Sequence, residues 1–339
     1  MSKDKTGPAH VSKFGNSSYE EKLRSILIQE KRLDKAFVEN ERNNYIQSTQ
    51  PGFVPKSSFP NTVNIELINK CNYKCSMCYT VNHEGIGISI NFENFKKIID
   101  ECANNNLLSL FIANGSEPLI FKEFRDYISY AAKKIPDIAV FTNALKLDKD
   151  TTDFLIDSGI TRINISLDAA TKETYKKIRG GDLEFIENNI NYLLSRKTEL
   201  QRPLVRVSFC VQDDNLHEVE RFKNKWEGRV DSVEFQSLHK FDSLEGINKI
   251  NNSTKISLED SKHFCSSPFG YIAVWSNGDI SPCCSFFGQK IVLGNINSET
   301  IKEAWQSSIS NTIRQGFLDK KTCGVCEECL SHTVDLQKN

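Results

Sequence analysis

The amino-acid sequence predicts an α/β protein built on a parallel sheet, closed or partly closed, with helices packed against it. Three observations support this class. Strand-like and helix-like segments alternate from about residue 61 to residue 245, which is typical of βα units. A cysteine-rich loop follows the first strand-like segment directly, at a place where parallel βα folds bind ligands. With 339 residues, the chain is long enough to bury such a core and a smaller appendage.

Residues 1–60 are expected to form an N-terminal extension. A polar tail precedes a charged segment, residues 18–47, whose apolar side chains recur at roughly helical spacing. A stretch rich in proline, residues 51–60, then ends the pattern. We expect this helix to pack on the main domain, and a clamp on a substrate or partner is the alternative. Its apolar positions are Leu23, Ile26, Leu27, Leu33, Phe37 and Val38.

Residues 61–250 are expected to form the main domain. Six segments resemble strands, and five helices lie between them. Parallel strands need helical crossovers, so this order predicts a barrel or partial barrel with ligands at the carboxyl ends of its strands. The expected strands are 62–68, 107–113, 138–144, 162–168, 204–211 and 230–238, and the expected helices are 91–105, 121–135, 149–159, 184–197 and 215–228.

Three cysteines follow the first strand with the spacing CxxxCxxC, at Cys71, Cys75 and Cys78. Three thiolates can hold a [4Fe–4S] cluster and leave its fourth iron without a protein ligand. An iron with a free position can bind and activate a cofactor, whereas a fully ligated cluster can only pass electrons. Half of a structural zinc site is the alternative, although zinc sites usually pair one CxxC with a second motif.

With this loop the chain resembles the radical S-adenosylmethionine (SAM) enzymes. The resemblance implies a partial (βα)6 barrel that resembles a TIM barrel, and SAM bound to the open iron through its amino and carboxylate groups. It also implies reductive cleavage of SAM to a 5′-deoxyadenosyl radical, which abstracts a hydrogen atom from a substrate. The family usually has an aromatic residue before the third cysteine. Here that residue is Met77, which is apolar and polarizable but not aromatic.

A second motif of the family lies at the end of the second strand. Gly115, Ser116, Glu117 and Pro118 occupy the place of its GGEP sequence, with serine at the second glycine. Small residues would let the backbone approach the SAM amino group, and Glu117 would offer a carboxylate acceptor for that ammonium. Alone, the tetrapeptide could also be a plain turn between a strand and a helix.

The third and fourth strands resemble family segments that bind the SAM ribose and carboxylate. The resemblance assigns Asn143, Ser166 and Asp168 to SAM or substrate. Alternation along the fourth strand places Asn164, Ser166 and Asp168 on one face, which we expect to point into the barrel. A hydrogen bond to a neighbouring loop is the alternative for each residue, because Asn, Ser and Asp commonly serve turns.

The fifth strand also alternates polar and apolar residues. On its polar face Arg206 could bind the SAM carboxylate or an anionic group of the substrate. Cys210 would place a thiol inside the barrel, where the resemblance to radical SAM epimerases implies a hydrogen-atom donor. A small buried cysteine that only fills space is the alternative.

The C-terminal region, residues 251–339, contains a second group of cysteines. Cys265 and Cys283 flank a predicted β-hairpin with the turn sequence SNGD. The region resembles a SPASM domain or its shorter twitch form, which implies one auxiliary [4Fe–4S] cluster, because two fully ligated clusters would need eight ligands. A structural zinc ion is the alternative. The expected ligands are Cys265, Cys283, Cys326 and Cys329, with Cys284 and Cys323 as alternates.

Composition restricts the classes of partner. The net charge is −1, with Lys and Arg spread along the chain, and no apolar run approaches the length of a membrane span. The first residues lack the apolar core of a signal peptide, and the cysteines group as ligands rather than as a disulfide scaffold. We therefore expect a cytoplasmic protein in a reducing compartment, without a nucleic-acid or membrane partner.

The resemblance implies an enzyme that abstracts a hydrogen atom from a non-activated C–H bond. We expect an epimerase or dehydrogenase that acts on a sugar-like or aminocyclitol-like metabolite, supplied with electrons by a flavodoxin- or ferredoxin-type donor. One alternative is a maturase that epimerises or cross-links a ribosomally made peptide. Another is a non-catalytic iron–sulfur electron-transfer protein, although that function would leave the open iron and the GSEP loop unexplained.

Overall fold

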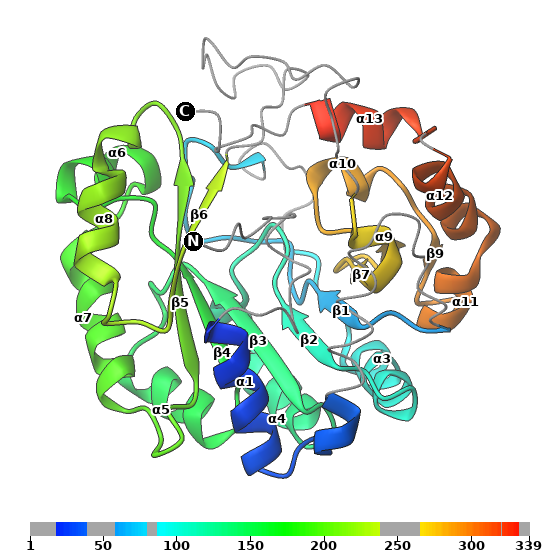
Figure 1. The fold of residues 1–339 in the computed structure, drawn as a ribbon, viewed down its shortest axis with the longest axis horizontal. Coiled ribbons are helices and arrows are strands. Elements are labelled where there is room, and N and C mark those ends of the chain that lie inside the picture. The colour runs from blue at the N-terminus through cyan, green and yellow to red at the C-terminus, as the bar shows by residue number, and fades with distance from the viewer. Residues whose placement is uncertain (1–17, 39–57, 80–86, 238–264, 320, 332–339) are drawn as a thin grey trace.

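One large sheet organises the chain in the computed structural model, which describes residues 18–38, 58–79, 87–237, 265–319 and 321–331. Within these residues the sheet has nine strands in the order β6-β5-β4-β3-β2-β1-β7-β8-β9. Figure 1 shows the sheet curving through the molecule, with helices outside it. The predicted α/β class is confirmed.

Six consecutive strands run parallel in the sheet, and each pairs with the next along the chain. This confirms the six predicted strands and the partial (βα)6 arrangement. Because all six run the same way, the loops that follow them gather at one edge of the sheet. The strands are β1 (Thr62–Ile65), β2 (Ser109–Ile112), β3 (Asp137–Thr142), β4 (Arg162–Ser166), β5 (Leu204–Val211) and β6 (Ser232–Ser237).

Helices cover the outer face of the parallel strands. Capping side chains fix where several of them begin, for example Asn91, whose side chain accepts a hydrogen bond from the Asn94 amide. The helix between residues 172 and 179 was not predicted. The helices are α3 (Phe92–Asn104), α4 (Phe124–Ala132), α5 (Lys149–Asp157), α6 (Lys172–Arg179), α7 (Leu183–Ser195) and α8 (Val219–Trp226), with short 3-10 turns η2 (Pro118–Ile120) and η3 (Leu216–Glu218).

The two faces of the sheet differ in chemistry. Outward residues such as Val63 and Ile65 are fully buried in the main apolar core, beneath the helices. On the inner face Phe111 and Tyr271 belong to a separate apolar cluster. The same face also carries polar residues such as Asn64, which pairs in register with Phe111. Strand alternation therefore separates a structural face from a face that can carry chemistry.

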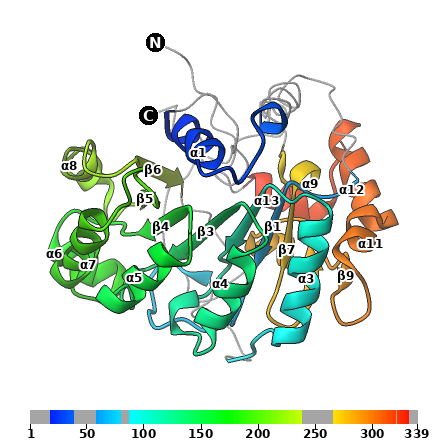
Figure 2. The ribbon, with the colours of Figure 1, turned by 90° about the horizontal axis from the view of Figure 1, so that it is seen from below.

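The N-terminal helix α1 (Ser18–Gln29) packs against the inner face of the sheet. Leu23, Ile26 and Leu27 are buried, and they form a cluster with Tyr19 and with Leu204 at the start of β5. Figure 2 shows α1 on the face of the sheet opposite α4 and α5. These contacts support the packing role expected for this helix. The remainder of the expected helical segment, after residue 38, lies outside the described residues.

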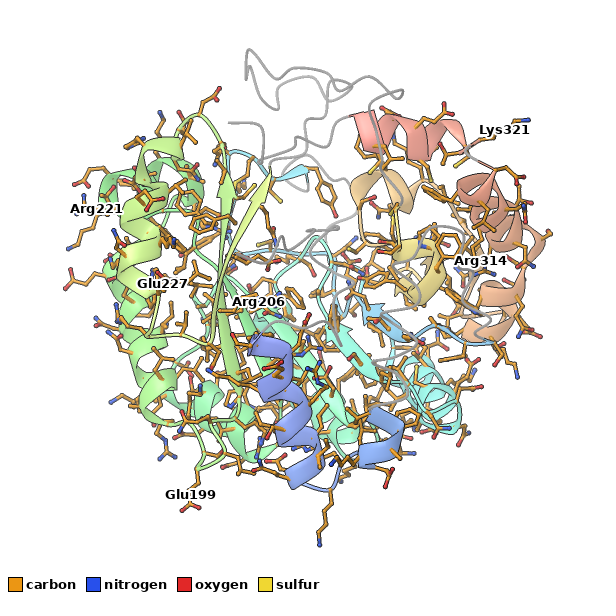
Figure 3. The ribbon with its side chains drawn as sticks, in the orientation of Figure 1. Glu199, Arg206, Arg221, Glu227, Arg314 and Lys321 are labelled. Carbon is orange, nitrogen blue, oxygen red and sulfur yellow. The ribbon has the colours of Figure 1, made fainter. Side chains whose placement is uncertain are left out.

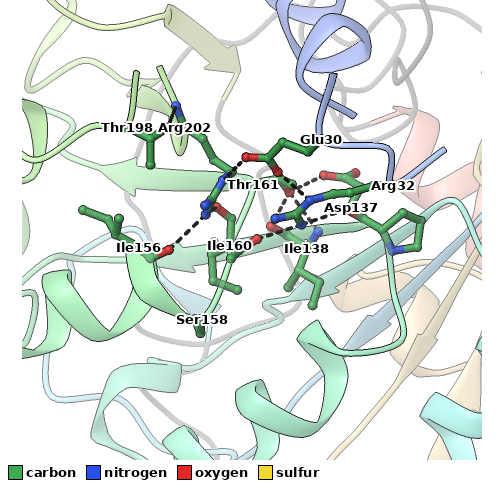
Figure 4. Close-up of polar contacts among 12 residues, drawn as sticks. Glu30, Arg32, Asp137, Ile138, Ile156, Ser158, Ile160, Thr161, Thr198 and Arg202 are labelled. Carbon is green, nitrogen blue, oxygen red and sulfur yellow. Dashed lines mark hydrogen bonds and ion pairs between the residues drawn. The ribbon is translucent and has the colours of Figure 1, made fainter. Parts of the chain in front are cut away.

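Polar contacts fasten the segment after α1 to the amino-terminal ends of the strands (Figure 4). Glu30 accepts a hydrogen bond from Arg202 Nε at 2.8 Å and lies 2.6 Å from Arg32 Nε. Arg32 in turn donates to the carbonyl of Gly159 at 2.8 Å, and Arg202 donates to the carbonyl of Ile156 at 3.0 Å. The helix is therefore held by partly buried charges as well as by apolar packing.

The C-terminal cysteine region continues the same sheet. The predicted hairpin is confirmed, since β7 and β8 pair antiparallel, and β7 also pairs parallel with β1. The predicted domain boundary at residue 250 lies outside the described residues. The elements are α9 (Ser267–Gly270), β7 (Tyr271–Val274), β8 (Asp279–Ser281), α10 (Phe286–Gln289), β9 (Gly294–Asn295), α11 (Ile301–Gln306), α12 (Ser308–Leu318) and α13 (Gly324–Ser331).

None of the helices described in the structure has the length and apolar character that a membrane crossing requires.

Candidate functional site

The CxxxCxxC loop begins at the carboxyl end of β1. Cys75 is buried, Cys71 and Cys78 are half-buried, and the amide of Cys78 donates to the carbonyl of Cys75 at 3.0 Å, which forms a tight turn. Burial raises the pKa of the Cys71 thiol, and that of the Cys75 thiol to about 11. Mutual repulsion among the three sulfurs adds to this effect for both. Three neighbouring thiols of this kind need a cationic partner to become thiolates.

This donor set fits an iron–sulfur cluster. All three candidate ligands are thiols, the softest ligands that proteins offer, and no carboxylate lies between them in the loop. Across the described part of the chain, no three His, Cys, Asp or Glu side chains are grouped to hold a single metal ion. The ligands of a cubane cluster bind different irons, so their sulfurs need not converge on one point.

Helix α6 supports the loop from one side. The amide of Ser76 donates to the carbonyl of Ile178 at 2.9 Å, and the rings of Tyr73 and Tyr175 meet edge to face at 6.4 Å. Tyr73 also lies against Gly181, where an added Cβ would come within 2.3 Å of its hydroxyl. The absent side chain of this glycine therefore leaves the room that the loop occupies.

Arg179, the last residue of α6, brings a buried positive charge to the loop. Its side chain is 9% exposed, and its Nη1 lies 3.8 Å from the Cys75 sulfur. Its Nε donates to Asp168 Oδ2 at 2.9 Å, and Nη2 donates to the same oxygen. We did not predict Arg179 from the sequence. The available signals were local: Thr171 caps the start of α6, and Gly180 ends it with a φ of 80°.

The GSEP loop follows β2 and contacts the cysteine loop through its backbone, because the amide of Glu117 donates to the carbonyl of Lys70 at 3.0 Å. Gly115 and Ser116 are half-buried, whereas Glu117 and Pro118 are buried. The structure therefore brings the GSEP and cysteine motifs together, as predicted.

The Glu117 carboxylate already has three partners in the chain. It accepts hydrogen bonds from Thr142 Oγ1 and the Asn143 amide, both at 2.7 Å, and from the Leu119 amide at 3.1 Å. Burial raises the pKa of Glu117 to about 7, and these donors oppose the shift. The carboxylate thus connects the ends of β2 and β3, a role that the sequence did not suggest. Its predicted contact with the SAM ammonium stays a prediction.

Asn143 and Ser166 lie at the same edge of the sheet. The side-chain nitrogen of Asn143, Nδ2, donates to Asn72 Oδ1 at 2.7 Å and lies 3.8 Å from the Cys71 sulfur. Ser166 is half-buried and pairs in register with Ser208 on β5. Both residues are therefore placed on the inner side of the site, in agreement with the polar face expected from alternation.

Asp168 follows β4 with a φ of 59°, an uncommon conformation for a residue other than glycine. Its Oδ2 accepts from Arg179, and its Oδ1 accepts from the amide of Cys210 at 2.7 Å. The side chain is 1% exposed. The structure thus gives Asp168 a positioning role between β4 and β5. The contact with SAM or substrate that the resemblance implies for it stays a prediction.

Arg206 lies on β5 opposite Asn164 of β4 and has partners within the chain. Its Nη1 is 3.1 Å from Glu234 Oε2, and its guanidinium stacks on the ring of Tyr19 at 4.5 Å. Figure 3 shows Arg206 beside α1, on the side of the strands that this helix covers. Glu234 and Tyr19 thus neutralise and cover the cation. Its predicted contact with the SAM carboxylate or an anionic group of the substrate stays a prediction. Its Nε has no hydrogen-bond partner in the described part of the chain.

Cys210 lies near the carboxyl end of β5, two positions above Ser208 on the same face. Its pKa is raised strongly, mainly by burial and further by Asp168, while Arg179 acts in the opposite direction. The group is therefore a neutral thiol at neutral pH. The hydrogen bond from its backbone amide to Asp168 connects Cys210, through Arg179, to Cys75 of the cysteine loop.

The six C-terminal cysteines gather around Cys283. Burial is the main cause that raises the pKa of the Cys329 and Cys326 thiols. Repulsion from Cys265 and Cys283 raises both pKa values further, and Cys323 also raises that of Cys326. Cys265 and Cys283 thus interact with each other and with both of the other predicted ligands. Cys323 is exposed, and Cys284 packs against the inner cluster that contains Tyr271, so both alternates lie beside the group.

Asn64 and Tyr271 connect the two cysteine regions. The amide nitrogen of Asn64, on β1, donates to the Tyr271 hydroxyl and to the side-chain oxygen of Asn114 beside the GSEP loop. Tyr271, on β7, interacts through its hydroxyl with the Cys284 thiol. These contacts were not predicted, because they depend on β7 joining the sheet beside β1.

Two family models match the chain, one over the parallel strands and one over the C-terminal cysteine region. Residues 65–225 match the radical SAM superfamily, and residues 265–330 match an iron–sulfur cluster-binding domain called SPASM. The first domain implies SAM and a [4Fe–4S] cluster, and the second implies auxiliary iron–sulfur clusters.

Individual proteins resemble the chain over different lengths. A probable GTP 3′,8-cyclase of Methanocaldococcus jannaschii is 27% identical over 160 residues, which are 47% of this chain and 52% of the cyclase. The antilisterial bacteriocin subtilosin biosynthesis protein AlbA of Bacillus subtilis is 24% identical over 300 residues, 78% of this chain and 66% of AlbA. The chain thus spans about half the length of the cyclase and 66% of AlbA.

Among solved structures, Streptococcus suis SuiB bound to the precursor peptide SuiA has a TM-score of 0.66 with 17% identity. The match covers 90% of this chain and 81% of SuiB. At this identity the likeness supports the shared fold.

Proposed function

Because residues 65–225 match the radical SAM superfamily and residues 265–330 match the SPASM domain, we propose that the chain is a radical SAM epimerase. It removes a hydrogen atom from a C–H bond of a peptide and returns one from Cys210 to the opposite face. The observation that carries this proposal is the place of Cys210 on the inner face of β5, near the carboxyl end of the strand. Its backbone amide donates to Asp168, which binds Arg179, and Arg179 reaches the cysteine loop.

Cys71, Cys75 and Cys78 would hold the SAM cluster, and the backbone of Gly115 and Ser116 would lie against SAM. When bound, the cluster and SAM supply a 5′-deoxyadenosyl radical, after one-electron reduction, that takes a hydrogen atom from the substrate.

Cys210 completes the reaction. Transfer of its hydrogen atom to the substrate radical breaks the S–H bond, forms a C–H bond and leaves a sulfur radical. One electron from a flavodoxin- or ferredoxin-type donor and one proton then restore the thiol. Burial supports this role, because it keeps the hydrogen on the sulfur at neutral pH.

A peptide is favoured over a sugar-like metabolite by the extent of the matches. AlbA, named for the biosynthesis of a bacteriocin, and SuiB, solved with a precursor peptide, each match more than three quarters of the chain. The cyclase matches 47% of it. The sugar-like or aminocyclitol substrate expected from the sequence stays a prediction.

Dehydrogenation is the second candidate, because the C-terminal thiols gather around Cys283 and could hold an auxiliary cluster that accepts an electron. The two reactions differ in product mass. In deuterated water an epimerase that uses a thiol adds one deuterium and makes the product one mass unit heavier. A dehydrogenase removes two hydrogens and makes it two units lighter.

The test uses the reconstituted full chain with SAM and a reductant in deuterated water. One set of reactions contains a pool of synthetic L-peptides, and a second contains aminocyclitols and nucleotide sugars. We expect a peptide product one mass unit heavier, and in the Cys210→Ala variant continued formation of 5′-deoxyadenosine without that product. A lighter product, or wild-type deuterium incorporation in the variant, would contradict the epimerase.

A further inference from the structure

The buried charge pair behind the cysteine loop carries an inference that rests on the proposed function, since it concerns the same SAM cluster. Arg179 and Asp168 are both almost fully buried, and a buried ion pair costs desolvation energy that exposed pairs avoid. The pair directly adjoins Cys75. The position of this ion pair therefore suggests a function other than stabilising the fold.

The fold fixes the guanidinium from several directions. The Ser76–Ile178 hydrogen bond attaches the loop to the turn that carries Arg179. Asp168 holds two of the three guanidinium nitrogens and leaves Nη1 directed at the Cys75 sulfur, 3.8 Å away. Asp168 is itself held through its other oxygen by the Cys210 amide.

An arginine is positively charged at every pH at which a protein is folded. Reduction adds one negative charge to a thiolate-ligated cluster, and in a poorly solvated site a nearby cation stabilises the more negative state. Asp168 cancels part of that effect, because its carboxylate is of opposite sign and lies behind the guanidinium. The two residues should therefore act on the cluster in opposite directions.

We propose that Arg179 is a positioning residue of the SAM cluster, which orients Cys75 and raises the reduction potential of the cluster, while Asp168 limits that increase. The reductive cleavage of SAM then depends on Arg179, a residue of α6 that is not itself a ligand of the cluster.

The experiment measures the reduction potential of the reconstituted full chain by redox titration with electron paramagnetic resonance. The signal of the SAM cluster is recognised because it changes when SAM is added, which separates it from an auxiliary cluster. Iron content is measured on the same samples. The variants are Arg179→Gln, Arg179→Lys and Asp168→Asn. Arg202→Gln is the control, because Arg202 is a part-buried arginine paired with Glu30 at the opposite ends of the strands.

For Arg179→Gln we expect the equilibrium constant of reduction to fall about tenfold, which for one electron is about 59 mV more negative. Arg179→Lys keeps the charge and should shift less. Asp168→Asn should shift the potential in the positive direction, and Arg202→Gln should not shift it.

A SAM-responsive cluster at the wild-type potential in Arg179→Gln would overturn the proposal. If Arg179→Gln binds no cluster, Asp168→Asn decides: a positive shift supports the proposal, and an unchanged or more negative potential overturns it. A wild-type chain without any SAM-responsive cluster would instead overturn the proposed function, and the inference with it.

Discussion

Glu117 shows how a single residue can hold the site together through partners within the chain. Its carboxylate is 1% exposed and accepts hydrogen bonds from the ends of β2 and β3. These bonds hold two loops that we expect to border SAM. The residue that matches the family motif thus has a structural function that its motif position alone does not reveal.

The raised pKa of Glu117 predicts a pH-dependent stability. Burial raises this pKa from 4.5 to about 7, so the folded chain holds more protons than the unfolded chain between these values. The free energy of unfolding should therefore fall as the pH rises from about 5 to about 7. Urea denaturation of the wild type and of Glu117→Gln at pH 5 and pH 8 measures this contribution. An equal pH dependence in the two chains would contradict it.

At the scale of elements, helix α1 and the small helix α10 fix different parts of the site. Helix α1 covers the inner face of β5 through Leu23 and Leu27, and the aromatic ring of its Tyr19 stacks on Arg206. Helix α10 contains Gly288, where an added Cβ would lie 2.1 Å from the Cys283 sulfur. One element thus supports the barrel, and the other leaves room for a cysteine.

Leu27→Ala should destabilise the chain by about 2–5 kcal/mol, because Leu27 is fully buried and truncation leaves a cavity. The measurement is the free energy of unfolding in urea. Ile309→Ala is the control, since Ile309 is 47% exposed on α12 and should change stability by no more than about 0.5 kcal/mol. Equal losses in the two variants would show that α1 does not contribute packing energy.

Gly288→Ala should remove iron from the C-terminal cysteines and leave the SAM cluster in place. The new methyl group would overlap the Cys283 sulfur, whereas Gly324→Ala, in α13, meets no atom within 4 Å and serves as the control. We expect the variant to lose about four irons, the content of one cubane cluster, with no loss in the control. Wild-type iron content in Gly288→Ala would argue against Cys283 as a ligand.

At the scale of the whole molecule, the continuous sheet joins the two cysteine regions. Because β7 pairs with β1, Tyr271 lies beside Asn64, and Asn64 reaches Asn114 next to the GSEP loop. The C-terminal cysteines are therefore built onto the edge of the barrel. An auxiliary cluster there would share the inner face of the sheet with the SAM site.

Iron counting tests the two-cluster arrangement without a substrate. Anaerobic reconstitution of the wild type should give about eight irons, and the Cys71/Cys75/Cys78→Ala triple variant about four, because each cubane cluster holds four. About four irons in the wild type, all lost in the variant, would mean that the C-terminal thiols hold zinc or no metal.

The sequence by itself determined the parallel strands, the cysteine loop after β1, the GSEP loop after β2 and the inward face of β5. These features follow from alternation, spacing and order along the chain, which are local and visible in one sequence. It did not reveal α6, although Thr171 and Gly180 mark both of its ends. The short helix has only two buried apolar side chains of ordinary helical spacing, Tyr175 and Ile178, so its pattern is weak.

Only the tertiary structure decided which polar residues already have partners. Asp168 binds Arg179 and accepts a hydrogen bond from the Cys210 amide, and Arg206 contacts Glu234 through Nη1. It also decided that β7 joins β1, more than 200 residues earlier in the chain. Such contacts depend on how strands and helices meet in space, and the energy of a buried charge depends on that environment rather than on its neighbours in sequence.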